Sequence, residues 1–178
     1  MAGQFPGWRV ALLTLVAMVA CERQEVPSTV DRSEVPVRIT RGFTTTESDS
    51  GRVRFILKAA IARVYADDVT HAETIEVEFY EDGERASVLT ADRGLLESGR
   101  VTATGNVVVE TVQGTRLETE SLYWDRSEEK IRSDEFVRIT RKGDPQVLTG
   151  RGMSSPPNLE FIDIDDYKVE GPMDPESP

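Results

Sequence analysis

The sequence predicts an all-β protein built from related antiparallel meander units. Apolar and polar residues alternate through the middle of the chain, with Ile75, Val77 and Phe79 at one parity and Glu76 and Glu78 at the other. This period of two is typical of a half-buried strand. Segments of this kind recur between turn-forming residues, and related segments repeat at a nearly constant spacing.

The predicted strands follow one another along the chain. They are residues 54–65, 74–80, 87–91, 100–104, 106–112, 116–120, 130–132, 136–140, 147–149 and 159–164. Segment 54–65 is ambiguous because it is rich in helix-forming residues. Strand is the preferred interpretation because residues 55, 57, 59 and 61 are apolar and alternate, and because tertiary context often overrides propensity.

An internal repeat relates several of these segments. Leu89–Asp92 matches Leu117–Glu120 at a spacing of 28, and Asn106–Val109 matches Phe136–Ile139 at a spacing of 30. The difference of two residues falls in the intervening turn, where insertions are tolerated. We expect each unit to hold two or three short strands.

The first 20 residues are predicted to be a signal peptide. Val10–Ala20 is a run of eleven residues that is apolar apart from Thr14. A membrane-spanning helix needs about 20 such residues, whereas the core of a signal peptide is shorter. Ala20 followed by Cys21, the only cysteine, resembles a bacterial lipobox, so we expect Cys21 to be lipidated and to become the mature N-terminus. A plain cleavable signal with a chance cysteine is the alternative.

Four regions follow from this pattern. They are the signal peptide (1–20), the lipidated cysteine with a flexible tether (21–36), a β-domain (37–170) and a disordered tail (171–178). The tether mixes charge with Ser, Thr and two prolines, and the tail has three prolines in eight residues. Neither segment has the apolar period that folding requires.

The composition argues against several classes of function. A net charge of -11 repels nucleic-acid phosphates, and no basic stripe with interleaved aromatics is present, so we expect no nucleic-acid partner. One histidine, His71, and no cysteine beyond Cys21 argue against a zinc or copper site. No nucleophile elbow, zinc-protease motif or phosphate loop occurs. We therefore expect neither an enzyme nor a cofactor.

Paired carboxylates are the one feature that would suit a glycosidase. The acids concerned are Asp92, Glu118, Glu120, Asp125 and Asp134. Most of them fall on the polar parity of predicted strands, where a solvated surface explains them. A carbohydrate hydrolase with two acids facing each other in a cleft stays a minor alternative.

One apolar face runs through the predicted strands and is the candidate lipid-binding site. Its residues are Ile75, Val77, Phe79, Leu89, Ala91, Val107, Val109, Leu117, Thr119, Val137 and Ile139. A hydrophobic core and an acyl-chain groove use the same residue types. A lipid carrier needs a continuous groove and open sheet edges, whereas a structural envelope lipoprotein needs a filled core and capped edges. Gly150 and Gly152 would permit a bulge or a close backbone approach, although a simple turn is the preferred interpretation.

Several motifs, taken in order and spacing, resemble the LptC family. They are Leu89-Thr-Ala-Asp92, Gly105-Asn106-Val-Val-Val109, Gly114-x-x-Leu117-x-Thr119-Glu120-x-Leu122-x-Trp124, Asp134-x-x-Val137 and Gly150-x-Gly152-Met153. That family is the membrane-anchored periplasmic component of lipopolysaccharide export, and the resemblance covers roughly residues 37–165. It implies a folded-over antiparallel β-jellyroll of the OstA/LptA-like type, with acyl chains of lipopolysaccharide between its two layers.

The resemblance also implies partners. These are the permease subunits of the inner-membrane ABC transporter at one sheet edge and an LptA-like bridge protein, bound by edge-strand addition, at the other. We expect a lipid-anchored adaptor on the periplasmic side of the inner membrane that passes lipopolysaccharide from transporter to bridge. The bridge edge is predicted near Leu148–Ile164, with Val37–Thr46 as the other candidate. The family usually carries a full N-terminal transmembrane helix, and this chain departs from it in that respect.

Overall fold

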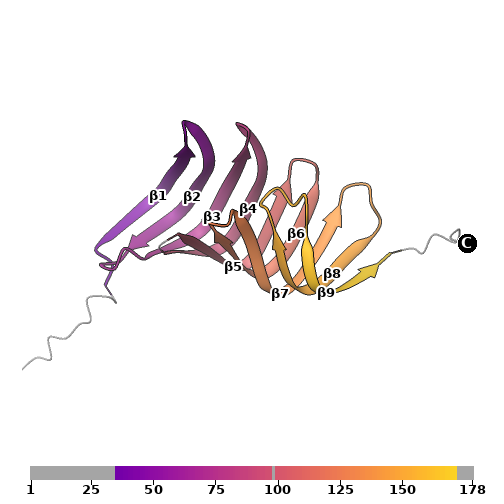
Figure 1. Cartoon of the computed structure of the whole chain (residues 1–178). Coiled ribbons are helices and arrows are strands. Elements are labelled where there is room, and N and C mark those ends of the chain that lie inside the picture. The colour runs from indigo at the N-terminus through magenta and orange to yellow at the C-terminus, as the bar shows by residue number, and fades with distance from the viewer. Residues whose placement is uncertain (1–34, 98, 172–178) are drawn as a thin grey trace, which may run out of the picture. The chain divides into compact units, whose positions relative to one another are not determined.

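Nine antiparallel strands make up the computed structural model over its described residues, 35–97 and 99–171 (Figure 1). They are β1 (Arg38–Asp49), β2 (Arg52–Val64), β3 (Thr70–Glu81), β4 (Glu84–Glu97), β5 (Arg100–Thr111), β6 (Thr115–Asp125), β7 (Lys130–Arg141), β8 (Val147–Ser155) and β9 (Asp163–Glu170). Each strand pairs with the next along the chain in one sheet. The all-β prediction is confirmed, including a strand over the ambiguous segment 54–65.

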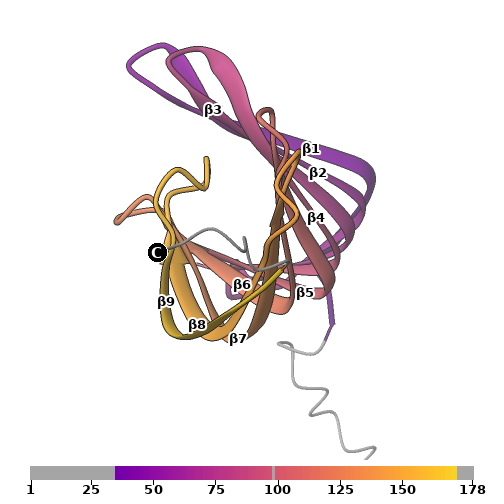
Figure 2. The same cartoon turned by 90° about the vertical axis from the view of Figure 1, so that its right-hand side faces the viewer.

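Most strands bend near their middle. The pairing register slips near the middle of four of them, between Thr90 and Arg93, Thr104 and Val107, Thr119 and Tyr123, and Ser133 and Phe136. At corresponding places in β1, β3 and β8, the residues Gly42, Thr74 and Gly152 have φ values of 63°, 51° and 76°. An extra residue in one strand bends it and increases its twist. We call these positions the bend line, and Figure 2 shows the strands curling over along it.

The bend folds the sheet back onto itself. The ring of Trp124 in β6 lies 4.7 Å from that of Phe55 in β2 and 5.1 Å from that of Phe79 in β3, both edge-on. Three strand spacings along a flat sheet would separate β3 from β6 by about 14 Å. Rings this close therefore belong to two facing layers, with the apolar core between them. This confirms the folded-over antiparallel sheet.

Two pairs of predicted strands are single strands in the structure. Segments 100–104 and 106–112 both belong to β5, and segments 130–132 and 136–140 both belong to β7. Gly105-Asn106 resembles a turn in the sequence but lies on the bend line, beyond which pairing with β6 resumes. Each repeat unit is therefore a hairpin of two long bent strands, and the prediction of short strands was wrong.

The last predicted strand, 159–164, is also misplaced. Leu159 has a φ of 55° and packs into the core from the loop between β8 and β9, and the strand itself begins at Asp163. The apolar residues of that loop imitate a strand pattern. The true strand carries three aspartates, which have low strand propensity, so it gives no clear period of two.

Gly150 and Gly152 lie within β8, so the preferred interpretation of a turn was wrong. A Cβ built on Gly150 would come within 2.4 Å of both the Asp166 carbonyl oxygen and Cγ2 of Ile164. A Cβ on Gly152 would lie 2.5 Å from a carboxylate oxygen of Asp165. The two glycines therefore let β9 approach β8 closely at the bend line.

The predicted signal peptide, Cys21, nearly all of the tether and the tail from residue 172 lie outside the described residues. The described residues all fall in one compact unit, Asp31–Pro178.

Candidate lipid-binding face and sheet edges

The predicted apolar face is the inner face of the folded sheet. Every residue predicted for it is at most 7% exposed except Thr119, which is half-buried. A single row of cross-strand neighbours shows how the strands align them. From β2 to β7 the row is Leu57, Val77, Leu89, Val109, Leu117 and Ile139. The alternation of apolar residues thus predicted which side chains share a face, and lipid binding by that face stays a prediction.

Thr119 has a structural role at the bend line. Its hydroxyl donates a hydrogen bond to the Phe136 carbonyl at 2.9 Å and lies 3.1 Å from the Ser133 hydroxyl. The Ser133 hydroxyl in turn donates to the Ser121 carbonyl at 2.7 Å. These side chains satisfy carbonyl groups where the strand register slips, as buried polar groups require.

The sequence prediction missed the half of the inner face that lies beyond the bend line. The missed buried residues include Ala62, Ala72, Val101, Ala103, Leu122, Trp124, Ile131 and Met153. In β6 the inward residue before the slip is Leu117, whereas those after it are Leu122 and Trp124. The slip reverses the parity of the inward positions. That reversal is visible in the sequence, but a single continuous alternation overlooks it.

The outer face carries cross-strand ion pairs. The Lys58 Nζ lies 2.5 Å from Oε1 of Glu78, and this hydrogen bond lowers the pKa of the Glu78 carboxyl. Glu118 accepts hydrogen bonds from Arg116 and from Arg138, each at 3.0 Å. The bond from Arg116 contributes most to lowering the pKa of Glu118. Lys58 with Glu78 and Arg138 with Glu118 therefore pair charges across neighbouring strands, while Arg116 pairs with Glu118 within β6.

The acids considered for a glycosidase do not lie in the buried core. Asp92, Glu120 and Asp134 are exposed, and Glu118 belongs to the outer ion pairs. The carboxylate of Asp125 accepts hydrogen bonds from the backbone and side chain of Ser127. Within residues 35–97 and 99–171, no group of three His, Cys, Asp or Glu side chains has metal-binding geometry.

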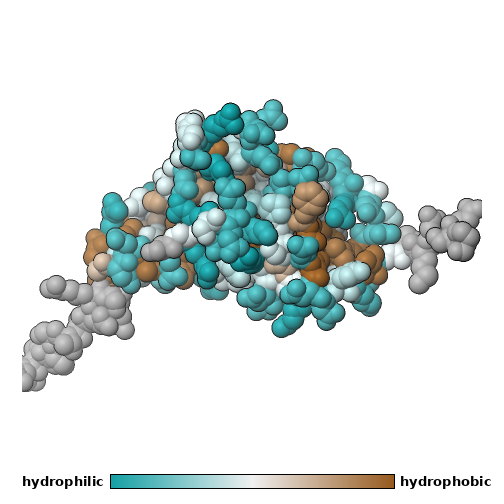
Figure 3. Space-filling view, in the orientation of Figure 1, coloured by the Kyte–Doolittle hydropathy of each residue, from teal (hydrophilic) through white to brown (hydrophobic). Residues whose placement is uncertain are grey.

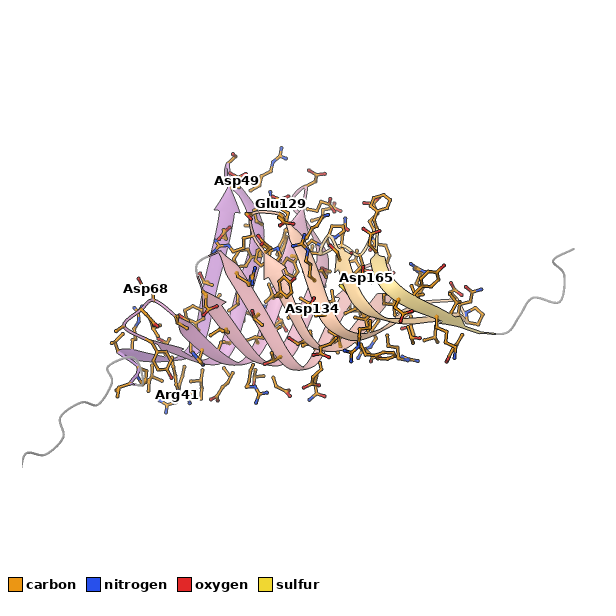
Figure 4. The ribbon with its side chains drawn as sticks, turned by 60° about the horizontal axis from the view of Figure 1, so that its bottom comes forward. Arg41, Asp49, Asp68, Glu129, Asp134 and Asp165 are labelled. Carbon is orange, nitrogen blue, oxygen red and sulfur yellow. The ribbon has the colours of Figure 1, made fainter. Side chains whose placement is uncertain are left out.

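The free margins of the two layers meet along a line that we call the seam. On one side of it are the β1–β2 and β3–β4 turns, and on the other are the β6–β7 turn and the β8–β9 loop. Arg126 pairs with Glu47 across the seam, and Arg54 pairs with Glu129. Figure 4 shows Asp49 and Glu129 at this end of the strands.

The β8–β9 loop closes the seam farther along. The Ser87 hydroxyl, which is fully buried, donates to the Pro157 carbonyl at 2.6 Å. The Asn158 side-chain amide donates to the Glu81 carboxylate at 2.9 Å. Leu159 follows directly and is 4% exposed in the core. The loop thus crosses from the end of β8 to the β3–β4 hairpin.

Strands β1 and β9 are the two edges of the sheet, and each pairs on one side only among the described residues. Large apolar residues are exposed at both edges: Val37 (66%) and Ile39 (55%) at β1, and Tyr167 (68%) and Val169 (50%) at β9. Tyr167 pairs with Gly150 and Val169 with Leu148, so both extend the inner rows. In Figure 3 hydrophobic surface is visible toward both ends of the sheet. Unpaired backbone groups beside apolar side chains suit strand addition by a partner.

A family comparison adds to this geometry. A sequence model described as "Lipopolysaccharide-assembly, LptC-related" matches residues 9–158, which is most of the chain. The chain belongs to the LptC-related lipopolysaccharide-assembly family. Membership connects it with lipopolysaccharide assembly and transport at the cell envelope, in a family of transport components rather than enzymes.

No curated protein sequence matches this LptC-related chain significantly. In the described part of the chain, no helix is long and apolar enough to cross a membrane.

Proposed function

We propose that this LptC-related chain is a periplasmic adaptor that takes lipopolysaccharide from the inner-membrane transporter and passes it to a bridge protein. The observation that carries the proposal is the continuity of the apolar inner face between two open edges. Its rows begin at Phe43 and Thr45 in β1, next to Ala59 and Leu57, and end at Tyr167 and Val169 in β9. A lipid held by this face would reach either edge without leaving apolar surroundings.

Lipid entry would exchange one set of apolar contacts for another. The core side chains now pack on each other, and acyl chains would replace those contacts at little net cost. The seam would have to open. Its ion pairs between Arg126 and Glu47 and between Arg54 and Glu129 are partly exposed, and such pairs contribute about 0–1 kcal/mol each. The molecule can therefore open at the seam more easily than through its core.

The position of Cys21 suggests which edge meets which partner. Cys21 precedes β1 by 38 - 21 = 17 residues. A flexible tether of that length spans on the order of 20–25 Å. A lipid-anchored Cys21 would therefore hold β1 near the inner membrane, and the transporter permease, in reach of β1. The bridge protein then takes β9, by strand addition beside Tyr167 and Val169.

The anchor is testable by itself. We expect mass spectrometry of the mature protein to find Cys21 as the N-terminal residue. It should carry two or more acyl chains, because a single chain anchors a protein only marginally. Cys21→Ser should release the protein or leave it uncleaved. An unmodified Cys21 or a retained Met1 would show that the lipobox interpretation is wrong.

A second candidate is a structural envelope lipoprotein with no lipid ligand. Its supporting observation is the filled interior, where residues such as Leu57, Val109 and Leu117 are fully buried. A carrier and a structural protein differ in whether lipid displaces these contacts.

Native mass spectrometry of the chain purified with lipopolysaccharide separates the two candidates. The adaptor should retain lipopolysaccharide in a defined stoichiometric complex and release it when the bridge protein is added. A chain that binds no lipopolysaccharide under these conditions would favour the structural protein.

A further inference from the structure

A pocket opens on the seam, between the β1–β2 and β3–β4 turns and the start of the β8–β9 loop. Its volume is about 370 Å³, within the range of small-ligand sites. Phe79 and Trp124 contribute its aromatic wall, and Val53, Ala86 and Pro157 contribute further apolar surface. The pocket therefore adjoins the core at the place where the two layers are held together by polar contacts.

Trp124, which lines this pocket, carries a polar group that lacks a partner among the described residues. The residue is 6% exposed, and its indole Nε1 is buried with no hydrogen-bond partner among the described residues. A buried tryptophan N–H usually finds an acceptor, because an unpaired donor loses its hydration without compensation. Nε1 is the only buried side-chain nitrogen or oxygen of the described residues in this situation. An acceptor supplied by a ligand would complete it.

The charges at the mouth of the pocket indicate what the ligand is not. The lining includes Arg52 and Arg54 with the acids Asp49, Glu81, Asp82 and Glu129. Arg54 is paired with Glu129, and Arg52 lies 3.7 Å from Asp82. Two cations and four acids leave the mouth negative. It repels a phosphate group and admits an uncharged one.

We propose that this pocket holds one acyl chain at its carbonyl end, with the Trp124 indole N–H donating a hydrogen bond to the acyl ester carbonyl oxygen. The chain then runs past Phe79 toward the core, and the polar remainder of the lipid leaves through the seam. The inference rests on the proposed lipid-carrier function and adds to it a specific contact at the seam.

Matched probes differ only in the acceptor. Monolauroylglycerol carries an ester carbonyl, and 1-O-dodecylglycerol is the same molecule without it. Calorimetric titration below the critical micelle concentration measures the affinity of each for the full-length chain, with Cys21→Ser in every variant so that no anchor competes. The wild-type pocket should bind the ester about 2- to 10-fold more tightly, as expected for one neutral hydrogen bond.

Three variants test whether the preference for the ester probe arises in this pocket. Trp124→Phe keeps an aromatic ring and removes the donor, so it should bind both probes with equal affinity. Ala86→Phe fills the pocket and should weaken both at least 10-fold. Ala66→Phe adds the same ring at an exposed position in the β2–β3 turn and should change neither. Circular dichroism melting shows which variants remain folded.

The outcomes separate this pocket from the proposed function. An ester preference that persists in Trp124→Phe, or wild-type affinity in Ala86→Phe, would refute the proposed acyl-chain site in this pocket. Neither result would count against lipid binding elsewhere in the molecule. Equal affinity of the wild type for the two probes would also overturn it, as expected if the Trp124 N–H is satisfied by the face of Phe55 or Phe79. Failure of the wild type to bind either probe or lipopolysaccharide would count against the carrier function as a whole.

Discussion

Adjacent residues of one strand face different surroundings in this fold. Leu117 is fully buried in the core, while its neighbour Glu118 lies on the outer face between Arg116 and Arg138. The sequence predicted this division because a strand turns successive side chains to opposite faces. The exposed ion pairs on the outer face are screened by water, so each of them contributes little to stability.

The pH dependence of Glu118 follows from its partners. Its folded-state pKa lies below the ordinary value of about 4.3, chiefly because Arg116 donates to it. Its contribution is therefore fully present above pH 4.3 and is lost as the pH falls through the lower folded-state pKa. We expect Glu118→Gln to lower the free energy of unfolding by less than about 1 kcal/mol at pH 7, with the difference disappearing in acid.

Urea denaturation between pH 2 and pH 7 measures this difference. Glu120→Gln is the matched control, because Glu120 is exposed and has no ion pair among the described residues. A loss of stability in Glu118→Gln that stays constant down to pH 2 would contradict the electrostatic origin.

Gly150 sets the contact between the last two strands. Because a Cβ there would overlap the Asp166 carbonyl and Ile164, a larger side chain must push β9 away from β8. Gly150→Val should therefore cost about 1–3 kcal/mol of stability, the usual range for overpacking. Hydrogen exchange should show the loss of protection concentrated in β9. Arg151→Val, at the exposed neighbouring position, should leave β9 protected.

The edge strands are the elements where the sequence was least informative. Asp163, Asp165 and Asp166 interrupt the alternation of apolar and polar residues in β9. Their charges also disfavour non-specific pairing at this open edge. Tyr167 and Val169 follow these aspartates in β9, are exposed, and belong to the inner rows of the sheet. A specific partner strand can cover these two side chains, whereas non-specific pairing with another sheet edge would bury the aspartate charges unfavourably.

Replacing both apolar residues of β9 should remove the bridge contact. We expect Tyr167→Asp combined with Val169→Asp to weaken binding of the bridge protein at least 10-fold in a surface plasmon resonance assay. Stability should change little, since both side chains are exposed. Phe136→Asp is the matched control, because Phe136 is 56% exposed but lies in β7, away from either edge. Equal loss in the control would mean that the bridge binds elsewhere, and β1 is then the candidate.

For the whole molecule, the period of two predicted the all-β class and one half of the inner face. The repeat predicted that the units resemble each other. Neither predicted where the sheet folds, because a slip of one residue at Gly105 or Asp134 looks like a turn when only neighbours in sequence are considered. The contacts across the seam could not be predicted from the sequence either, since Arg54 and Glu129 are 75 residues apart.

The central claim is that the inner face of this sheet holds the acyl chains of lipopolysaccharide. Site-specific photo-crosslinking in cells tests it most directly. Crosslinkers at Phe79, Leu117 and Val137 face inward, and those at Glu78, Glu118 and Arg138, each one residue away, face outward. The claim predicts lipopolysaccharide adducts from the first three positions only. Equal capture from both faces, or capture from neither, would contradict it.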